Sequence, residues 1–361
     1  MDRRSSIAAY LFLTPFLVIL GVFFVYAAAR AVWFSFTDFN LFNQGNWVGL
    51  KNYLALFREA NFLRALQNSI VFAAIVTTAQ TIGALLVAAA LNSRIRGINA
   101  FRAAFYIPSI ASSVVTTIIF LWLFQRRGLI NYLATQAIAS REVIVVFLGV
   151  MITTHWLQVA LARRHRRPAH ALEPSFLLAA ILVAIVVTAI LRGLGIVVVQ
   201  EAEPVGIIWL QTRQRAFGIP LPLIAIMIQN TFTTIPTMML LYLAALQDVS
   251  PSLYEAASLD GAGWWRQFVS VTLPSVRPIT FLVVTLGLIG TLQMFDQVAI
   301  FGDAVPLESV ITLAYFVYDR MFPGAQLPEV GLASAAALFL AFLTLMIVVV
   351  QRLFISSEGD R

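Results

Sequence analysis

The chain has 361 residues, of which 60% are hydrophobic and only 11% are charged, with a formal net charge of +7. A soluble domain carries about 25% charged residues, so this composition indicates several membrane-spanning segments. The absence of cysteine excludes disulfides and thiolate chemistry. Lys51 is the only lysine, and no Gly-Lys-Ser or Gly-Lys-Thr sequence occurs, which excludes an ATPase of the P-loop type on this chain.

The N-terminal region predicts a first span. Arg3 and Arg4 precede an apolar run over residues 7–29. A cleaved secretory signal is the alternative, since Ala27–Ala29 would suit a signal peptidase. The apolar core of such a signal usually has about 7–15 residues, which is shorter than this run. The polar and aromatic residues 38–61 then predict an external loop.

The remaining apolar runs predict seven more spans, over residues 68–91, 105–124, 143–161, 176–199, 220–246, 279–299 and 330–350. Pro108 can bend the third of the eight spans. Arginine-rich loops usually face the cytoplasm. The basic residues between spans therefore predict the inner loops: Arg94, Arg96, Arg102, Arg163, Arg164, Arg166 and Arg167. The protein is thus predicted to lie in the cell membrane, and an even number of spans places both termini in the cytoplasm. The predicted fold class is an all-α transmembrane helical bundle.

Residues 250–278 combine charged residues with helix breakers between two long apolar runs. Ser250 is a good N-cap and Pro251 suits the first helical position, which predicts a short helix over 252–260. Gly261 can take the left-handed conformation that ends a helix. A second helical piece is predicted over 264–271, ended by Pro274.

This stretch resembles the EAA loop of ATP-binding-cassette (ABC) importer permeases. The matching residues are Glu255, Ala256, Ala257, Gly261, Leu273 and Pro274, with Val271 where the family usually has Ile. The resemblance implies a cytoplasmic loop over 248–278 whose short helix sits in a groove of a separate ATPase subunit. Without it, the stretch would be an ordinary amphipathic loop helix.

The resemblance extends along most of the chain. The sequence Leu-Gln-Met-Phe-Asp at 292–296 is similar to the maltose- and glycerol-phosphate-type permeases, in which the sugar site lies among the last core helices. The external residues 302–306 and the segment 135–206 depart from the pattern. The resemblance thus implies one transmembrane domain, 1–361, with a six-span core at 66–134 and 207–355 and an inserted helical hairpin at about 135–206.

Polar side chains within spans are costly and often mark a transport path. Two groups qualify, one before and one after the EAA-like loop: Gln229, Asn230 and Thr233, and Gln293 and Asp296. Amides and carboxylates can hydrogen-bond sugar hydroxyls, and the ring of Tyr315 can stack on a sugar face. The alternative is that these side chains only join helices to one another.

The resemblance therefore implies a permease subunit of an ABC importer, whose solute is expected to be a sugar. The resemblance implies two ATPase subunits carrying ATP and Mg²⁺, a second permease subunit and an extracytoplasmic solute-binding protein. The chain itself is expected to be no enzyme and to bind no cofactor or metal, and it has neither a His-Glu-x-x-His nor a Gly-x-Ser-x-Gly motif. An ion-coupled secondary transporter and a non-transporting membrane scaffold remain as alternatives. The solute, whether disaccharide, oligosaccharide or glycerol-phosphate, stays open.

Overall fold

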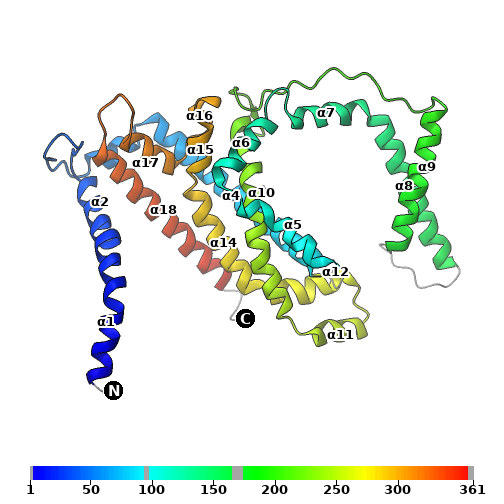
Figure 1. Ribbon diagram of the computed structural model, residues 1–361, viewed down its shortest axis with the longest axis horizontal. Coiled ribbons are helices and arrows are strands. Elements are labelled where there is room, and N and C mark those ends of the chain that lie inside the picture. Colours follow the sequence, from blue (N-terminus) through cyan, green and yellow to red (C-terminus); the bar gives the residue numbers. More distant parts are fainter. Residues whose placement is uncertain (1–2, 93–96, 165–173, 357–361) are drawn as a thin grey trace. The chain divides into compact units, whose positions relative to one another are not determined.

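The computed structural model describes residues 3–92, 97–164 and 174–356. Arg94, Arg96 and the arginine-rich loop from His165 onward lie outside these residues. The chain forms two compact units, Met1–Phe120 with Leu210–Arg361, and Leu121–Trp209. Both units are helical, which confirms the predicted all-α class (Figure 1).

The first unit contains five long apolar helical segments. The first is a continuous run of α1 (Arg3–Leu20), a π-helical segment (Gly21–Tyr26) and α2 (Ala27–Ser35). The others are α4 (Ala60–Leu91), α10 (Leu221–Gln247), α14 (Arg277–Leu292) and α18 (Val330–Ser356). Each of these segments exceeds the roughly 20 residues needed to cross a bilayer, since the candidate span that contains α14 continues through α15 to Ala304.

Helix α4 is the central packing element of this unit, because α10 and α14 both lie against it. Its contact faces are rich in small residues such as Ala73, Ala84 and Ala88, which are 0–3% exposed. Small side chains let helix backbones approach closely in a membrane, where lipid offers no hydrophobic drive for association. Gly83 shows how close the approach is, since a Cβ there would lie 2.7 Å from Cδ1 of Ile235 on α10.

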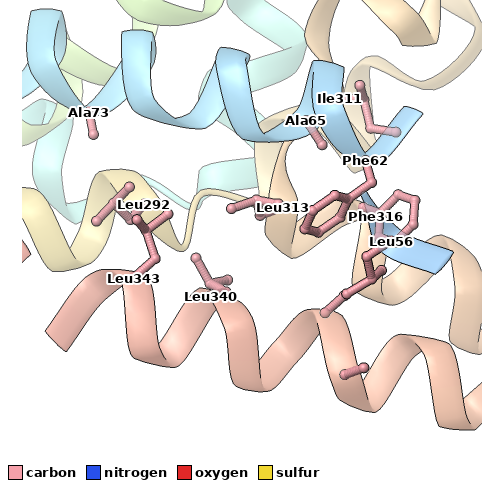
Figure 2. Close-up of a cluster of buried hydrophobic side chains, with 12 residues drawn as sticks. Leu56, Phe62, Ala65, Ala73, Leu292, Ile311, Leu313, Phe316, Leu340 and Leu343 are labelled. Carbon is pink, nitrogen blue, oxygen red and sulfur yellow. The ribbon is translucent and has the colours of Figure 1, made fainter. Parts of the chain in front are cut away.

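Two apolar clusters lie at the two ends of α4. At the Ala60 end, Phe62 and Ala65 pack with Leu313, Phe316 and residues of α18 (Figure 2). Toward the Leu91 end, the cluster draws on α4, α10 and α14 and comprises Ala84, Ala88, Leu91, Met239, Tyr242, Leu243, Leu246, Val276 and Val283. The helices are therefore held together along the whole length of α4.

The predicted third span is broken rather than continuous. Helices α5 (Ile98–Ile110) and α6 (Ser113–Leu123) meet at 94°. Pro108 lies shortly before the break, Ala111 is extended, and the Ser112 carbonyl accepts the Thr116 N–H at 3.0 Å to start α6. The described residues thus contain seven helices that could cross a membrane, or eight if the bent pair is one span.

The second unit consists of α7 (Leu129–Ala139), α8 (Arg141–Arg164) and α9 (Pro174–Gly193), with α8 and α9 packed together. The span predicted over 176–199 is too long, because α9 ends at Gly193 and Gly195 is left-handed with φ +71°. Helix α7 was not predicted. It is anchored by Asn131, whose amide donates to the Ile207 carbonyl at 2.8 Å and whose Oδ1 accepts from Trp209 Nε1 at 2.9 Å.

Short elements occupy the loop predicted over 38–61 and the region between α14 and α18. The first region contains α3 (Lys51–Leu56) and the beginning of α4. The second contains part of α15 (Asp296–Phe301), a 3-10 turn (Gly302–Ala304), α16 (Leu307–Val310) and α17 (Leu313–Met321). A two-stranded hairpin, β1 (Arg215–Ala216) and β2 (Ile219–Pro220), precedes α10.

The start of α18 is fixed by a close backbone contact at Gly331. Its N–H donates to the Phe39 carbonyl at 3.0 Å, and a Cβ at this position would lie 2.1 Å from the Thr37 carbonyl oxygen. Only glycine fits here, since neither backbone can move without losing this hydrogen bond. The loop after α2 is thereby attached to α18.

We expect Gly331→Ala to lower the free energy of unfolding by about 1–3 kcal/mol, because the added methyl group must displace backbone. Gly290→Ala in α14 is the matched control. A Cβ there meets nothing within 4 Å, so alanine should raise stability by up to about 1 kcal/mol through helix propensity. Thermal unfolding of the purified variants in detergent measures both changes. Equal effects of the two substitutions would contradict the assigned contact.

Candidate coupling loop and candidate solute path

The EAA-like loop begins with α11 (Pro251–Leu259), within one residue of the helix predicted from the sequence. Pro251 is the first helical residue, as predicted. Ser250 is the N-cap, but its hydroxyl lies 2.8 Å from the Ser252 hydroxyl and caps no backbone N–H. The backbone geometry of the N-cap is therefore present without the side-chain hydrogen bond that usually accompanies it.

The end of α11 is a Schellman motif centred on Gly261, which has φ +75°. The Gly261 N–H donates to the Ser258 carbonyl at 3.0 Å, and the Ala262 N–H donates to the Ala257 carbonyl at 2.9 Å. These bonds satisfy carbonyls that a helix end otherwise leaves free. The left-handed residue is needed because a Cβ disfavours this conformation, which explains glycine at this point of the motif.

The predicted second helical piece is longer than expected. Helix α12 (Trp264–Gln267), a π-helical segment (Phe268–Thr272) and α13 (Leu273–Ser275) follow one another without a gap. The prediction that Pro274 ends this piece after residue 271 is wrong. Pro274 occupies the first turn of α13, where its missing N–H is tolerated. Leu273 and Pro274 are exposed.

Side-chain hydrogen bonds hold α11 against this second piece. The hydroxyl groups of Tyr254 and Thr272 lie 3.0 Å apart, and Gln267 Nε2 donates to Ser258 Oγ at 2.8 Å. Thr272 is 6% exposed, and Val276, one turn further on, belongs to the cluster with α4 and α10. These contacts connect α11 to the cluster formed by α4, α10 and α14.

The outer face of α11 is free within the described part of the chain. Glu255 and Ala256 are exposed, and no described basic side chain forms an ion pair with Glu255. Leu253 is 49% exposed and Leu259 is 90% exposed. A carboxylate between exposed leucines, beside alanines that keep the surface low, is a suitable surface for docking another protein.

The first group of the predicted solute path lies inside the bundle. Gln229 is fully buried and donates from Nε2 to Thr117 Oγ1 on α6 at 2.6 Å, whereas its Oε1 has no partner. Asn230 is 9% exposed and its Oδ1 is also unpartnered. The Thr233 hydroxyl donates to its own helix, to the Gln229 carbonyl at 3.2 Å.

The second group lies where the span predicted over 279–299 is interrupted. Helix α14 ends at Leu292, Gln293 is its exposed C-cap, and exposed Asp296 begins α15. Tyr315 comes from α17, and its ring centroid lies 6.1 Å from that of Phe295. No hydrogen bond joins this group to Gln229, Asn230 or Thr233 among the described residues.

An aromatic surface accompanies the second group. The Tyr318 ring lies 5.0 Å from Phe295 and 6.0 Å from Tyr315. Burial raises the pKa of Asp319, while burial and then the nearby carboxylate of Asp319 raise the pKa of the Tyr315 phenol. The Tyr315 hydroxyl therefore stays protonated at neutral pH and can donate a hydrogen bond to a solute.

Sequence reasoning missed Gln80 on α4. Its side chain is 1% exposed, and neither amide atom has a partner. A Cβ on Gly287 of α14 would lie 2.2 Å from Gln80 Nε2, so this glycine provides the space for the amide. The hydroxyls of Thr77 and Thr291 pair at 3.2 Å between the same two helices. The run Thr77, Thr78, Gln80 and Thr81 within an apolar span was the available signal.

The chain matches the family described as "Binding-protein-dependent transport system inner membrane component" over residues 172–357. It belongs to this family. The chain is thus a multi-pass permease of the inner membrane, of the ABC importer class, and permease subunits of this class are not enzymes. The Glu255–Ala257 sequence is the EAA motif typical of the family, and membership favours this reading over the secondary-transporter and scaffold alternatives.

Individual relatives cover nearly the whole chain. It is 26% identical to the "Probable ABC transporter permease protein YurN" of Bacillus subtilis (strain 168), with 100% of each covered. It is 25% identical to the sn-glycerol-3-phosphate transport system permease protein UgpA of Salmonella choleraesuis, with 98% of this chain and 96% of the relative covered. It is 26% identical to the lactose transport system permease protein LacF of Rhizobium radiobacter, with 89% and 86% covered.

The fold is also similar to a solved transporter. The structure of a bacterial ABC transporter involved in the import of the acidic polysaccharide alginate matches with a TM-score of 0.66 at 17% identity. The match covers 98% of this chain and 96% of that one. At this identity the similarity concerns the fold of the permease alone.

The unpartnered amide of Gln80 allows a test of what the buried polar residues do. We expect Gln80→Met to raise the free energy of unfolding by about 1–3 kcal/mol, since a buried unsatisfied amide is replaced by an apolar side chain of similar shape. If Gln80 serves the solute path, the same variant loses transport.

Gln351→Met on α18 is the matched control. The Gln351 amide donates to the Phe281 carbonyl and to Thr285 Oγ1, both at 3.1 Å, so the substitution should lower stability. Thermal unfolding and solute uptake are measured for both variants. Destabilisation by Gln80→Met would show that the amide is a structural bond between helices instead.

Proposed function

We propose that the chain is a transmembrane permease subunit of an ATP-driven importer that moves a sugar or sugar-like solute inward, energised by separate ATPase subunits. The observation that carries the proposal is α11. It exposes Glu255, Ala256 and Leu259 to a partner. Its residues Tyr254 and Ser258 are hydrogen-bonded to the segment that leads into α14. A helix held in this way is built to receive force from another protein.

The proposed coupling runs from the ATPase to the spans through few contacts. Two ATPase subunits, which bind ATP and Mg²⁺, close and displace α11. The Tyr254–Thr272 contact and the buried Val276 pass this displacement to α10 and α14. These spans then alternate between outward and inward access. This mechanism requires no catalytic residue on this chain, because it consists only of movements of α11, α10 and α14 relative to one another.

Further partners follow from the relatives and from the exposed surface. An extracytoplasmic solute-binding protein is supported by the alginate transporter, which has been solved with a periplasmic protein bound to an alginate pentasaccharide. A second permease subunit would complete the pathway. The candidate span Leu11–Ser35 has none of its most apolar window buried within the chain, which leaves a face for that subunit or for lipid.

The proposed orientation places both termini and the coupling loop in the cytoplasm. Helix α10 separates the hairpin β1–β2 from α11, so these two elements lie on opposite sides of the membrane. The arginine-rich sequence from Arg163 to Arg167 favours the cytoplasm for the loop between α8 and α9. With the α5–α6 pair counted as one span, this orientation is consistent along the chain.

The proposed solute is a sugar or a sugar-like molecule, because relatives transport lactose and sn-glycerol-3-phosphate and the matching structure imports alginate. Within the chain, the amide oxygens of Gln229 and Asn230 have no partner and can accept hydrogen bonds from sugar hydroxyls. Thr233 adds a hydroxyl nearby. Gln293, Asp296 and Tyr315 offer polar atoms beside an aromatic surface, an arrangement suited to the polar edge and apolar face of a sugar ring.

Glu255→Lys tests the proposal in membrane vesicles containing the assembled transporter. We expect the variant to insert normally but to lose ATP-driven solute uptake by roughly tenfold or more, as reversal of a central interface charge usually does. ATP hydrolysis and uptake are measured together, so that loss of coupling is seen directly.

Asp248→Lys is the matched control, because Asp248 is an exposed carboxylate just outside α11. It should leave uptake near the normal level. Normal uptake by Glu255→Lys would contradict the proposed role of α11, and a chain that works without any ATPase would contradict the function itself.

A further inference from the structure

The hairpin before α10 has an unusual turn. Arg215 pairs with Pro220 and Ala216 pairs with Ile219, which leaves Phe217 and Gly218 as a two-residue connection. Both residues are left-handed, with φ +53° and +80°. Two positive φ angles are the pattern of a type I′ turn, for which Asn-Gly is the favoured sequence. Phenylalanine at the first position is thus a poor choice for folding.

Phe217 gains no compensating burial. Phe217 is fully exposed and has the highest exposed fraction among the large hydrophobic residues of the described chain. The structure therefore holds a large aromatic ring in water on a backbone conformation that a Cβ disfavours. Such an outlier on a rigid element is typical of a residue kept for binding.

Two interactions connect the hairpin to the first unit. The Leu221 N–H, at the start of α10, donates to the Gln214 carbonyl at 3.0 Å. Arg213 forms an ion pair with Glu308 of α16 at 2.8 Å, and Glu308 also contacts Arg64 of α4. These contacts connect the hairpin that carries Phe217 to α10, α16 and α4.

The location and charge of the hairpin indicate the partner. It lies at the end of α10 opposite α11, so a cytoplasmic coupling loop places Phe217 on the external side. Arg213, whose side chain is 80% exposed, and exposed Arg215 both precede Phe217 in the hairpin sequence. An exposed aromatic ring on a basic hairpin fits an apolar depression with an acidic rim, because aromatic residues and arginine are enriched at interfaces.

We propose that Phe217 is a docking anchor for the extracytoplasmic solute-binding protein, with Arg215 contacting carboxylates around the depression that receives the ring. The inference rests on the proposed function and adds the surface through which the binding protein engages this subunit. Exposed Phe217 would be buried in that complex, and α10 would connect the docking site directly to the polar residues Gln229 and Asn230.

The test uses the assembled transporter in nanodiscs and the purified solute-binding protein that stimulates its ATP hydrolysis. Phe217→Asn creates the favoured turn sequence, so it should preserve or raise thermal stability and leave basal ATP hydrolysis unchanged. The concentration of binding protein needed for half-maximal stimulation should rise by roughly tenfold or more, as for loss of an interface hot spot. Phe217→Trp, which keeps an aromatic anchor, should stay near the normal value.

Arg215→Gln supplies a second variant, expected to weaken stimulation and to reduce its dependence on salt. Unchanged stimulation in Phe217→Asn would overturn the inference and leave the ring as an anchor in the membrane interface. Loss of the second permease from the purified complex would overturn it in favour of a contact between permeases. If no solute-binding protein stimulates the unmodified complex, the proposed function fails, and this inference fails with it.

Discussion

The close packing of α10 and α14 on α4 is the constraint on which the rest of the structure depends. In a bilayer there is no hydrophobic drive between helices, so association requires close contact and shared polar bonds. Gly83, Gly287 and the alanines of α4 supply the contact, and the Thr77–Thr291 hydroxyl pair supplies a bond between helices. The EAA loop follows α10 and leads into α14, so both of its ends join helices that pack on α4.

The arrangement separates rigid from exposed parts in a way that suits a lever. On one side of the membrane, α11 is fixed by a Schellman motif and by hydrogen bonds to the segment ahead of α14. On the other side, the hairpin with Phe217 is attached through Arg213 and Glu308 to α16 and α4. Between them, α10 carries buried amides with free oxygens. Family membership makes the chain an importer permease, and these features propose how its parts serve that role.

The sequence predicted features that depend on local chemistry. Apolar length located most spans, and Ser250, Pro251 and Gly261 located α11 within one residue. Features that depend on packing were harder to predict. The break between α5 and α6 falls three residues after Pro108, and Pro274 lies in the first turn of α13, where its missing N–H is tolerated. Gln80 was missed because its burial and its unpaired amide arise only when Gly287 of α14 lies against it.

The most direct test is purification of the tagged chain from native membranes in mild detergent, with identification of the proteins that accompany it. The account predicts an ATPase and a second permease in the purified complex, with the ATPase lost when the exposed face of α11 is altered at Glu255. A folded chain that purifies alone in good yield would contradict the account, because the exposed surface of α11 would then have no partner.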